Sequence, residues 1–273
     1  MPELPEVESY ARALRAPLIG RTITAVRVYW PRTVAQPSVR EFTRRLPGLR
    51  VNAIDRRAKY LVFALSAKSS QVPTDYLLIH LKMSGQLDVT SHPKPIDKHD
   101  RVIFDLSGGR RLHFNDMRKF GRMYLVPHPE VITERLGPEP LSDEFTLDGF
   151  RQRLRKRKGR LKSLLLDQTF IAGIGNIYAD EALWLARLHP LRRADSLSEA
   201  ETRALYRAIR AALREGIKRN GASFDRVYRS GDYKFRVYAR ADRPCRRCRQ
   251  PIRRTVVGQR GTYFCATCQS LRG

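Results

Sequence analysis

The chain has 273 residues, of which 53 are Lys or Arg and 27 are Asp or Glu, so its formal net charge at pH 7 is +26. A hydrophobic content of 42% excludes global disorder and predicts a packed core that needs no disulfide bonds. No apolar run approaches the roughly 18 residues of a membrane-spanning helix, so nucleic acid is favoured over a membrane as the polyanionic partner.

The N-terminal residues, MPELPEVESY, contain three glutamates and no apolar core, so they are not a secretory signal. We therefore expect a cytoplasmic protein whose four cysteines stay reduced. Residues 4–18 predict a helix, because Val7, Ala11 and Leu14 repeat at helical spacing and Gly20 follows as a stop.

Short β-rich segments follow this helix. Ser107-Gly108-Gly109 reads as a hairpin turn between two of them. The seven predicted strands cover residues 23–30, 50–55, 60–65, 76–81, 101–106, 111–114 and 123–126. Many strands joined by local turns predict an antiparallel sandwich or barrel.

The pattern changes at residues 137–145, where Pro138 and Pro140 prevent a helix and predict a linker. Helical periodicity follows. Residues 151–162 hold eight basic side chains and no acid, which in so basic a chain indicates a phosphate-facing surface. A further helix is expected from Ser198, which forms an S-x-x-E capping box with Glu201, to Asn220.

The cysteines form two C-x-x-C pairs separated by sixteen residues, namely Cys245, Cys248, Cys265 and Cys268. This spacing predicts a four-thiolate zinc ribbon with a β-hairpin between the pairs. Because all four ligands come from the protein, the single zinc ion is expected to be structural. Arg260 falls where the hairpin tip is expected and is a candidate phosphate clamp.

Pro2 gains chemical meaning if Met1 is removed. Its secondary amine then titrates near ~8, so part of it is unprotonated at neutral pH and can attack a carbon to form an iminium ion. Glu3 and Glu6 are candidate proton carriers beside it. By itself, the same segment is better interpreted as a frayed terminus before a helix that starts with proline and has acids in its first turn.

Several motifs in order along the chain resemble the bacterial formamidopyrimidine-DNA glycosylase family. They are Pro2-Glu-Leu-Pro-Glu6, Arg57-Ala-Lys-Tyr60, His80-Leu-Lys-Met-Ser-Gly85, Asp116-Met-Arg-Lys-Phe-Gly121, Leu136-Gly-Pro-Glu-Pro-Leu141, Gly173-Ile-Gly-Asn-Ile-Tyr-Ala179 and the cysteines. The resemblance covers essentially the whole chain.

The resemblance implies a bifunctional base-excision repair glycosylase and AP lyase. Such an enzyme flips oxidised purines (formamidopyrimidines, 8-oxoguanine) out of duplex DNA, removes them through a Schiff base on Pro2, and nicks the strand by β,δ-elimination. It implies that Glu3 assists sugar-ring opening, and that Lys59 and Arg260 also serve catalysis. Damaged double-stranded DNA is the expected partner of a monomer that needs zinc but no small-molecule cofactor.

The resemblance also implies DNA-binding roles for His80, Arg118, Asn176, Lys162 and Arg260. Asn176 follows Gly-Ile-Gly and is expected to be a helix N-cap, where free N–H groups and the helix dipole favour a phosphate. Met83, Arg118 and Phe120 match the residues that fill the space left by the flipped base. Flipping a base costs a few kcal/mol of unstacking, which such wedge residues offset.

The expected fold class is α+β. A catalytic β-sandwich domain flanked by helices (1–136) precedes the linker (137–145), a helical domain with a helix–two-turn–helix motif (146–239) and a zinc-finger β-hairpin (240–273). Two features depart from the family pattern: Lys82 stands where glycine is common, and residues 222–237 look short for the loop over the extruded base, which leaves the preferred lesion open.

Two alternatives remain at this point. One is an endonuclease VIII-like glycosylase for oxidised pyrimidines, against which Leu4 argues because that group typically reads M-P-E-G-P-E. The other is a non-catalytic zinc-ribbon protein that binds nucleic acid. Pro2 followed by Glu3 at a processed terminus favours the enzyme, because a binding module does not need them.

Overall fold

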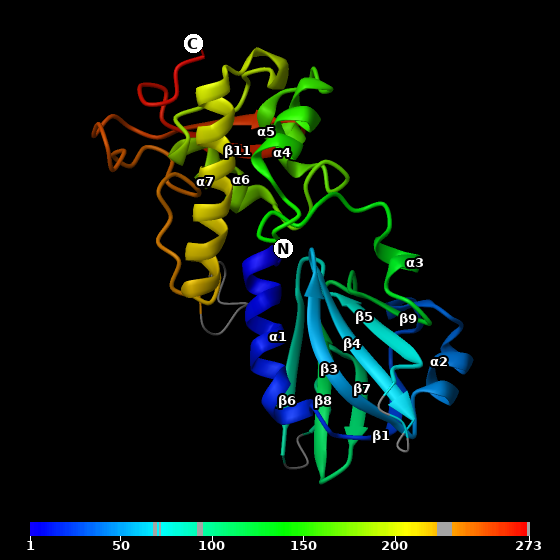
Figure 1. Cartoon of the computed structure of the whole chain (residues 1–273). Coiled ribbons are helices and arrows are strands. Elements are labelled where there is room, and N and C mark those ends of the chain that lie inside the picture. Colours follow the sequence, from blue (N-terminus) through cyan, green and yellow to red (C-terminus); the bar gives the residue numbers. More distant parts are fainter. Residues whose placement is uncertain (68–69, 71, 92–94, 223–230, 272–273) are drawn as a thin grey trace. The chain divides into compact units, whose positions relative to one another are not determined.

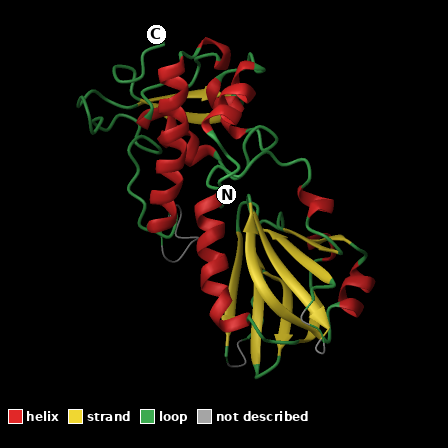
Figure 2. Cartoon of the chain, in the orientation of Figure 1, coloured by secondary structure: helices red, strands yellow, loops and turns green. Residues whose placement is uncertain are grey.

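The computed structural model describes residues 1–67, 70, 72–91, 95–222 and 231–271. These residues divide into two units. The first is built from Met1–Pro2 and Glu6–Glu134, and the second from Glu3–Pro5, Arg135–Ala222 and the described part of Ser230–Gly273. Figure 2 shows that the first unit holds most of the strands and the second most of the helices.

The first unit is a sandwich of two sheets with helix α1 (Leu4–Leu18) packed along it (Figure 1). One sheet has the strand order β1-β7-β8-β6, and the other has the order β2-β9-β5-β4-β3. The strands are β1 (Ile23–Val28), β2 (Val34–Gln36), β3 (Leu49–Arg57), β4 (Tyr60–Ala67), β5 (Asp75–His80), β6 (Gly85–Thr90), β7 (Asp100–Leu106), β8 (Arg110–Asp116) and β9 (Arg122–Val126).

Burial explains why these segments fold as they do. The apolar stripe of α1, including Val7, Ala11 and Leu14, joins the core between the sheets. All pairs are antiparallel except β2 with β9, which is parallel. The predicted helix at 4–18 and the antiparallel sandwich are confirmed. The sequence patterns did not predict β2, β6, or the short helices α2 (Val39–Arg45) and α3 (Glu130–Thr133).

The described residues of the second unit form four α-helices, a short 3-10 helix (Ala194–Ser196) and one hairpin. The α-helices and the hairpin strands are α4 (Leu147–Arg155), α5 (Leu161–Leu166), α6 (Asn176–Leu185), α7 (Glu199–Lys218), β10 (Arg253–Val257) and β11 (Arg260–Phe264). The predicted capping box at Ser198 and Glu201 is present in both directions. The expected β-hairpin lies between the cysteine pairs. The fold class is therefore the expected α+β arrangement.

The basic segment 151–162 is not one helix. It is divided between the end of α4 and the start of α5, and the interruption contains Gly159, a poor helix former. Residues 137–145, all of them described, form turns and coil without helix or strand. Among the described residues, no helix combines the length and the apolar character needed to cross a membrane.

Candidate active site and nucleic-acid interface

At the N-terminus, a buried residue directly follows an exposed one. Met1 is about half exposed (49%), whereas Pro2 is buried. Residue Leu4 begins α1, so the proline ring is held at a helix entrance. Only removal of Met1 converts the Pro2 nitrogen from an amide into a secondary amine.

Glu3 is bound to the N-terminus of helix α6 and is only 2% exposed. Its carboxylate accepts backbone N–H groups from Gly175 (2.8 Å), Ile177 (2.8 Å) and Tyr178 (3.2 Å). These donors and the helix dipole stabilise its negative charge. The carboxylate is therefore fixed in position, and the residue before it in the chain is Pro2.

The glycines of the Gly173-Ile-Gly175 motif make room for this contact. A Cβ on Gly175 would lie 2.5 Å from Cδ of Glu3, and a Cβ on Gly173 would lie 2.7 Å from Leu4. Gly173 also has φ = +90°, a conformation that favours glycine. The two glycines were the sequence signal for a close approach by the N-terminal segment.

The expectation that Asn176 is a helix N-cap with free N–H groups for a phosphate is wrong. Gly175 is the N-cap and Asn176 is the first helical residue. The nearby N–H groups are occupied by Glu3. The Asn176 side-chain amide instead donates to the carbonyl oxygen of Gly261 at 2.8 Å. This bond ties the start of α6 to the zinc hairpin beside Arg260, which is exposed as the first residue of β11.

Lys162 lies in the interior of the second unit and is 0% exposed. Its ammonium donates to Asp180 Oδ1 at 2.7 Å and to the carbonyl oxygen of Asn176 at 2.9 Å. The other Asp180 oxygen accepts the backbone N–H of Tyr263 in β11 at 3.0 Å. In this structure the ammonium therefore contacts protein groups and is not at the surface, where direct DNA contact was expected.

The four cysteines converge as a metal-binding set. Their sulfur atoms all lie within 4.8 Å of one another, close to the ~3.8 Å edge of a tetrahedron with Zn–S bonds of about 2.3 Å. N–H groups of Trp184 and Arg247 donate to Cys245 Sγ, as expected around a thiolate. None of the four is in a disulfide. The site fits one structural zinc ion, as predicted.

Two candidate phosphate-binding residues lie at strand ends in the first unit. Lys59 is in the two-residue turn between β3 and β4, and His80 ends β5. Burial, together with the charges of Lys82 and Lys59, lowers the pKa of His80 to about 3. Its Nδ1 accepts the backbone N–H of Lys82 at 2.9 Å. The neutral ring therefore carries its proton on Nε2, which can donate to a phosphate oxygen.

The three expected wedge residues lie together on two exposed loops of the first unit. Met83 is 44% exposed and Phe120 is 49% exposed. A guanidinium N–H of Arg118, also exposed, lies 3.6 Å from the sulfur of Met83. By residue type alone, Met83 and Phe120 resemble core residues, but the structure places them at loop tips.

The backbone of the loop that contains Met83 explains why glycine is common at position 82. Lys82 has φ = 54°, in the left-handed region where glycine is favoured. The lysine therefore introduces local strain in addition to a charge. Half of the other departure, the short segment 222–237, falls on residues 223–230, which lie outside the described residues. At and just beyond the end of this segment, Glu181 accepts the backbone N–H groups of Arg236, Val237 and Tyr238.

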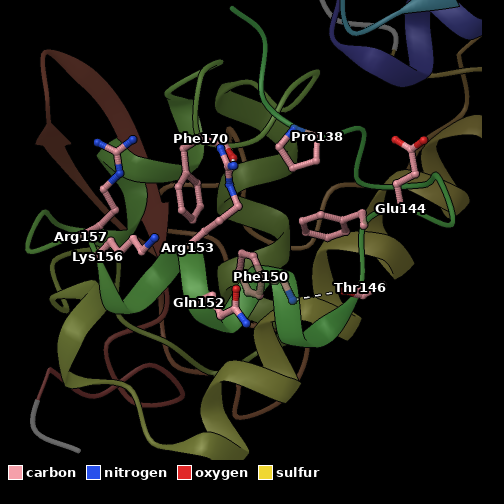
Figure 3. Close-up of a pocket in the computed structure, with 11 residues that line it drawn as sticks. Pro138, Glu144, Thr146, Phe150, Gln152, Arg153, Lys156, Arg157 and Phe170 are labelled. Carbon is pink, nitrogen blue, oxygen red and sulfur yellow. Dashed lines mark hydrogen bonds between the residues drawn. The ribbon is translucent and has the colours of Figure 1, made fainter.

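Part of the basic segment 151–162 borders a depression in the second unit (Figure 3). Phe145, Phe150 and Phe170 form its apolar lining. Arg153 donates to the carbonyl oxygens of Thr169 and Phe170, so its guanidinium has protein partners. Residues 155–158 and 160 are exposed basic residues. They are the part of the segment that can face phosphate.

Three protein-family models match successive parts of the chain. Residues 1–123 match the formamidopyrimidine-DNA glycosylase N-terminal domain, residues 136–227 its H2TH domain, and residues 243–271 the zinc finger found in FPG and IleRS. Formamidopyrimidine-DNA glycosylase of Herpetosiphon aurantiacus is 44% identical over 99% of this chain and 100% of its own length. That of Chloroflexus aurantiacus is 47% identical over 98% of both.

Solved structures agree with the sequence comparisons. Fpg (MutM) of Lactococcus lactis, in complex with DNA that contains N7-benzyl-Fapy-dG, has a TM-score of 0.91 at 34% identity, covering 98% of this chain and 100% of its own. MutM (Fpg) of Thermus thermophilus has a TM-score of 0.85 at 41% identity, covering 98% of both chains.

Proposed function

The chain belongs to the formamidopyrimidine-DNA glycosylase family, and on this basis we propose that processed Pro2 is the nucleophile of its reaction. Family membership makes the protein a DNA glycosylase with AP lyase activity that acts in base-excision repair of oxidised purines. The observation that carries the proposal is the environment of Glu3, the residue that follows Pro2. Its carboxylate is fixed by three backbone N–H groups at the start of α6.

The proposed reaction begins when the Pro2 nitrogen attacks C1′ of the damaged nucleotide. The bond from C1′ to the base breaks, and the base leaves as an anion that takes a proton from water. The Glu3 carboxylate accepts the proton that the Pro2 nitrogen loses and passes it to the ring oxygen, so the sugar ring opens and an iminium ion forms between Pro2 and C1′. The same carboxylate stabilises the positive charge of the iminium. The iminium then withdraws electrons, so loss of a C2′ proton expels the 3′ phosphate, and a second elimination expels the 5′ phosphate.

Phosphate contacts are proposed on each unit separately. In the first unit, the Lys59 ammonium and the Nε2–H of His80 supply donors to the DNA backbone. In the second, Arg260 supplies a charge at the hairpin tip, and Asn176 holds the neighbouring Gly261. Lys162 supports the same region through Asp180, which binds both Lys162 and β11. Arg260 and Lys59 also assist the eliminations.

We further propose that the protein acts on damaged duplex DNA as a monomer, with zinc as its only cofactor, in the bacterial cytoplasm at the nucleoid. The proposed domain boundaries are 1–136 for the catalytic β-sandwich domain, 137–145 for the linker, 146–239 for the helical domain and 240–273 for the zinc finger. Leu4 favours oxidised purines over the pyrimidine lesions of endonuclease VIII-like enzymes. Related structures support the same substrate class, since one holds MutM bound to DNA that contains carbocyclic 8-oxo-G and another holds Lactococcus lactis Fpg bound to DNA that contains Fapy-dG.

Borohydride trapping tests the nucleophile, because borohydride reduces an iminium ion to a stable amine. Processed protein should become covalently joined to duplexes that contain an oxidised purine, and should not be trapped on undamaged duplex. Retaining Met1 or adding an N-terminal tag should abolish trapping while DNA binding persists. Glu3→Gln should slow base release by about 10²–10⁴-fold.

The outcomes separate the alternatives. Trapping that persists with a blocked N-terminus moves the nucleophile to a lysine such as Lys59. Excision of oxidised pyrimidines in preference to purines favours the endonuclease VIII-like activity. Absence of trapping on every oxidised, ring-opened or abasic substrate refutes the proposed nucleophile.

A further inference from the structure

The two loops that carry the wedge residues come from different strand connections. Met83 lies between β5 and β6, and Arg118 and Phe120 lie between β8 and β9. Neither loop has the regular backbone hydrogen bonding of a strand at its tip. Something else must hold two exposed tips in a defined arrangement, because ordering a side chain and its backbone at the moment of insertion costs about 1–2 kcal/mol per residue.

One buried carboxylate is bonded to both loops. Asp116, the last residue of β8, is 0% exposed. Its Oδ1 accepts the hydroxyl of Ser84 at 2.5 Å and the backbone N–H of Arg118 at 3.2 Å. Its Oδ2 accepts the backbone N–H of Gly121 at 2.7 Å. Ser84 follows Met83 and Gly121 follows Phe120, so each donor is within one residue of a wedge side chain or belongs to one.

The bonds close a ring between the loops. Ser84 Oγ donates to Asp116 and also accepts the backbone N–H of Arg118 at 3.1 Å. The Arg118 N–H therefore contacts both the carboxylate and the opposite loop. A break at Asp116 removes the shared acceptor from both loops together.

The packing beneath the loops also involves one residue that contacts both of them. A Cβ on Gly85 would lie 3.0 Å from the ring of Phe114, and a Cβ on Gly121 would lie 2.3 Å from it. Both loops therefore rest on one buried ring with only a hydrogen atom between. Asp116 lies directly opposite Gly85 in the β6–β8 register, so the carboxylate and the ring hold the same two loop bases.

We propose that Asp116 is a positioning residue that holds the Met83 loop and the Arg118–Phe120 loop as one preformed wedge for the space left by the flipped base. The inference rests on the proposed function, which supplies the flipped base. Asp116 does not itself touch DNA in this role. Preorganisation lowers the cost of insertion, because the loop conformations need not be selected after DNA binds.

Asp116→Asn is the informative change because it keeps the shape of the side chain but leaves one acceptor oxygen and one NH₂ group. Its NH₂ must face either Ser84 and Arg118 or Gly121, so one loop loses its acceptor. Excision from a lesion-containing duplex should fall on the order of 10²-fold, as for other small misplacements of positioning groups. Trapping on a single-stranded abasic oligonucleotide should stay near the wild-type level, because no stack has to be filled.

The matched control is Asp105→Asn. Asp105 is in β7 opposite Arg111, towards the far end of β8 from Asp116, and it pairs with Arg27 and Arg111. This variant makes the same charge change on the same sheet and should excise from duplex like the wild type. In a background with Met83→Ala, Arg118→Ala and Phe120→Ala together, Asp116→Asn should add little further loss, because the side chains on both loops that it positions are already gone.

Each possible outcome either supports or overturns the positioning role of Asp116. A selective loss on duplex supports the positioning role if it is absent from Asp105→Asn and non-additive with the combined replacement of Met83, Arg118 and Phe120 by Ala. Wild-type excision by Asp116→Asn overturns it, and so does an equal loss on duplex and single strand, which indicates a general folding defect. Failure of wild-type protein to trap on any abasic or oxidised substrate, duplex or single-stranded, would refute the proposed nucleophile, and that result is read before any variant is compared.

Discussion

Replacement of Lys162 by methionine tests the buried ion pair of the second unit. The change keeps an unbranched side chain but leaves Asp180, which is 1% exposed, without the ammonium 2.7 Å away. Removing one partner of a buried pair typically costs about 3–5 kcal/mol, because the remaining charge stays desolvated. We expect a loss of that size in the unfolding free energy of the second unit at pH 8.

The loss of unfolding free energy in Lys162→Met is also expected to depend on pH. Burial raises the pKa of Asp180 to about 7 even with Lys162 present, and removing the ammonium raises it further. A carboxyl whose pKa is raised on folding contributes stability below its unfolded value, near ~3.9, and loses it as pH rises through the folded value. The wild-type and Lys162→Met carboxyls therefore differ in protonation only above about pH 7. The deficit of Lys162→Met should be nearly constant between pH 5 and pH 6 and should widen by up to about 1.4 kcal/mol between pH 7 and pH 8.

Urea unfolding in excess zinc measures the deficit. Trp184 lies in the second unit and Trp30 in the first, so a Trp30→Phe background isolates the signal of the second unit. The control is Lys162→Met combined with Asp180→Asn, which removes the unpaired charge but keeps an oxygen for Tyr263. It should recover much of the loss and show little pH dependence.

Two results would refute this reasoning. One is a deficit below about 1 kcal/mol at pH 8, since this would mean that the pair contributes no more than an exposed one. The other concerns DNA. Because the ammonium is buried, Lys162→Met should leave the salt dependence of duplex binding unchanged. A fall of about one unit in that slope would show that Lys162 binds phosphate directly.

Three further predictions concern the loops, the metal and the phosphates. Lys82→Gly should stabilise the first unit by up to about 1 kcal/mol, because glycine tolerates φ = 54°, and destabilisation in urea unfolding followed by Trp30 would contradict this. Cys245→Ser should release zinc and weaken DNA binding while the first unit stays folded; full zinc content by metal analysis would argue against it. Arg260→Ala should reduce the slope of log K against log salt by about 0.9, whereas the neutral Asn176→Ala should lower affinity with little change in slope.

The sequence alone predicted the features that depend on local pattern. Helical periodicity located α1, and the capping box located the start of α7, because both depend on residues within a few positions of one another. The C-x-x-C spacing predicted the zinc hairpin, since each pair must bring two thiolates to one ion. These elements therefore needed no knowledge of the rest of the fold.

Only the tertiary structure showed what the polar residues of the site contact. Asn176 follows a glycine motif that locally predicts a phosphate-binding N-terminus, yet Glu3, distant in sequence, occupies those N–H groups. Lys162 belongs to a run of basic residues, yet it is buried against Asp180. Local pattern gives a residue's position along its own segment, but burial and hydrogen bonding depend on which distant segment packs against it. That is why these partners could not be predicted from the sequence.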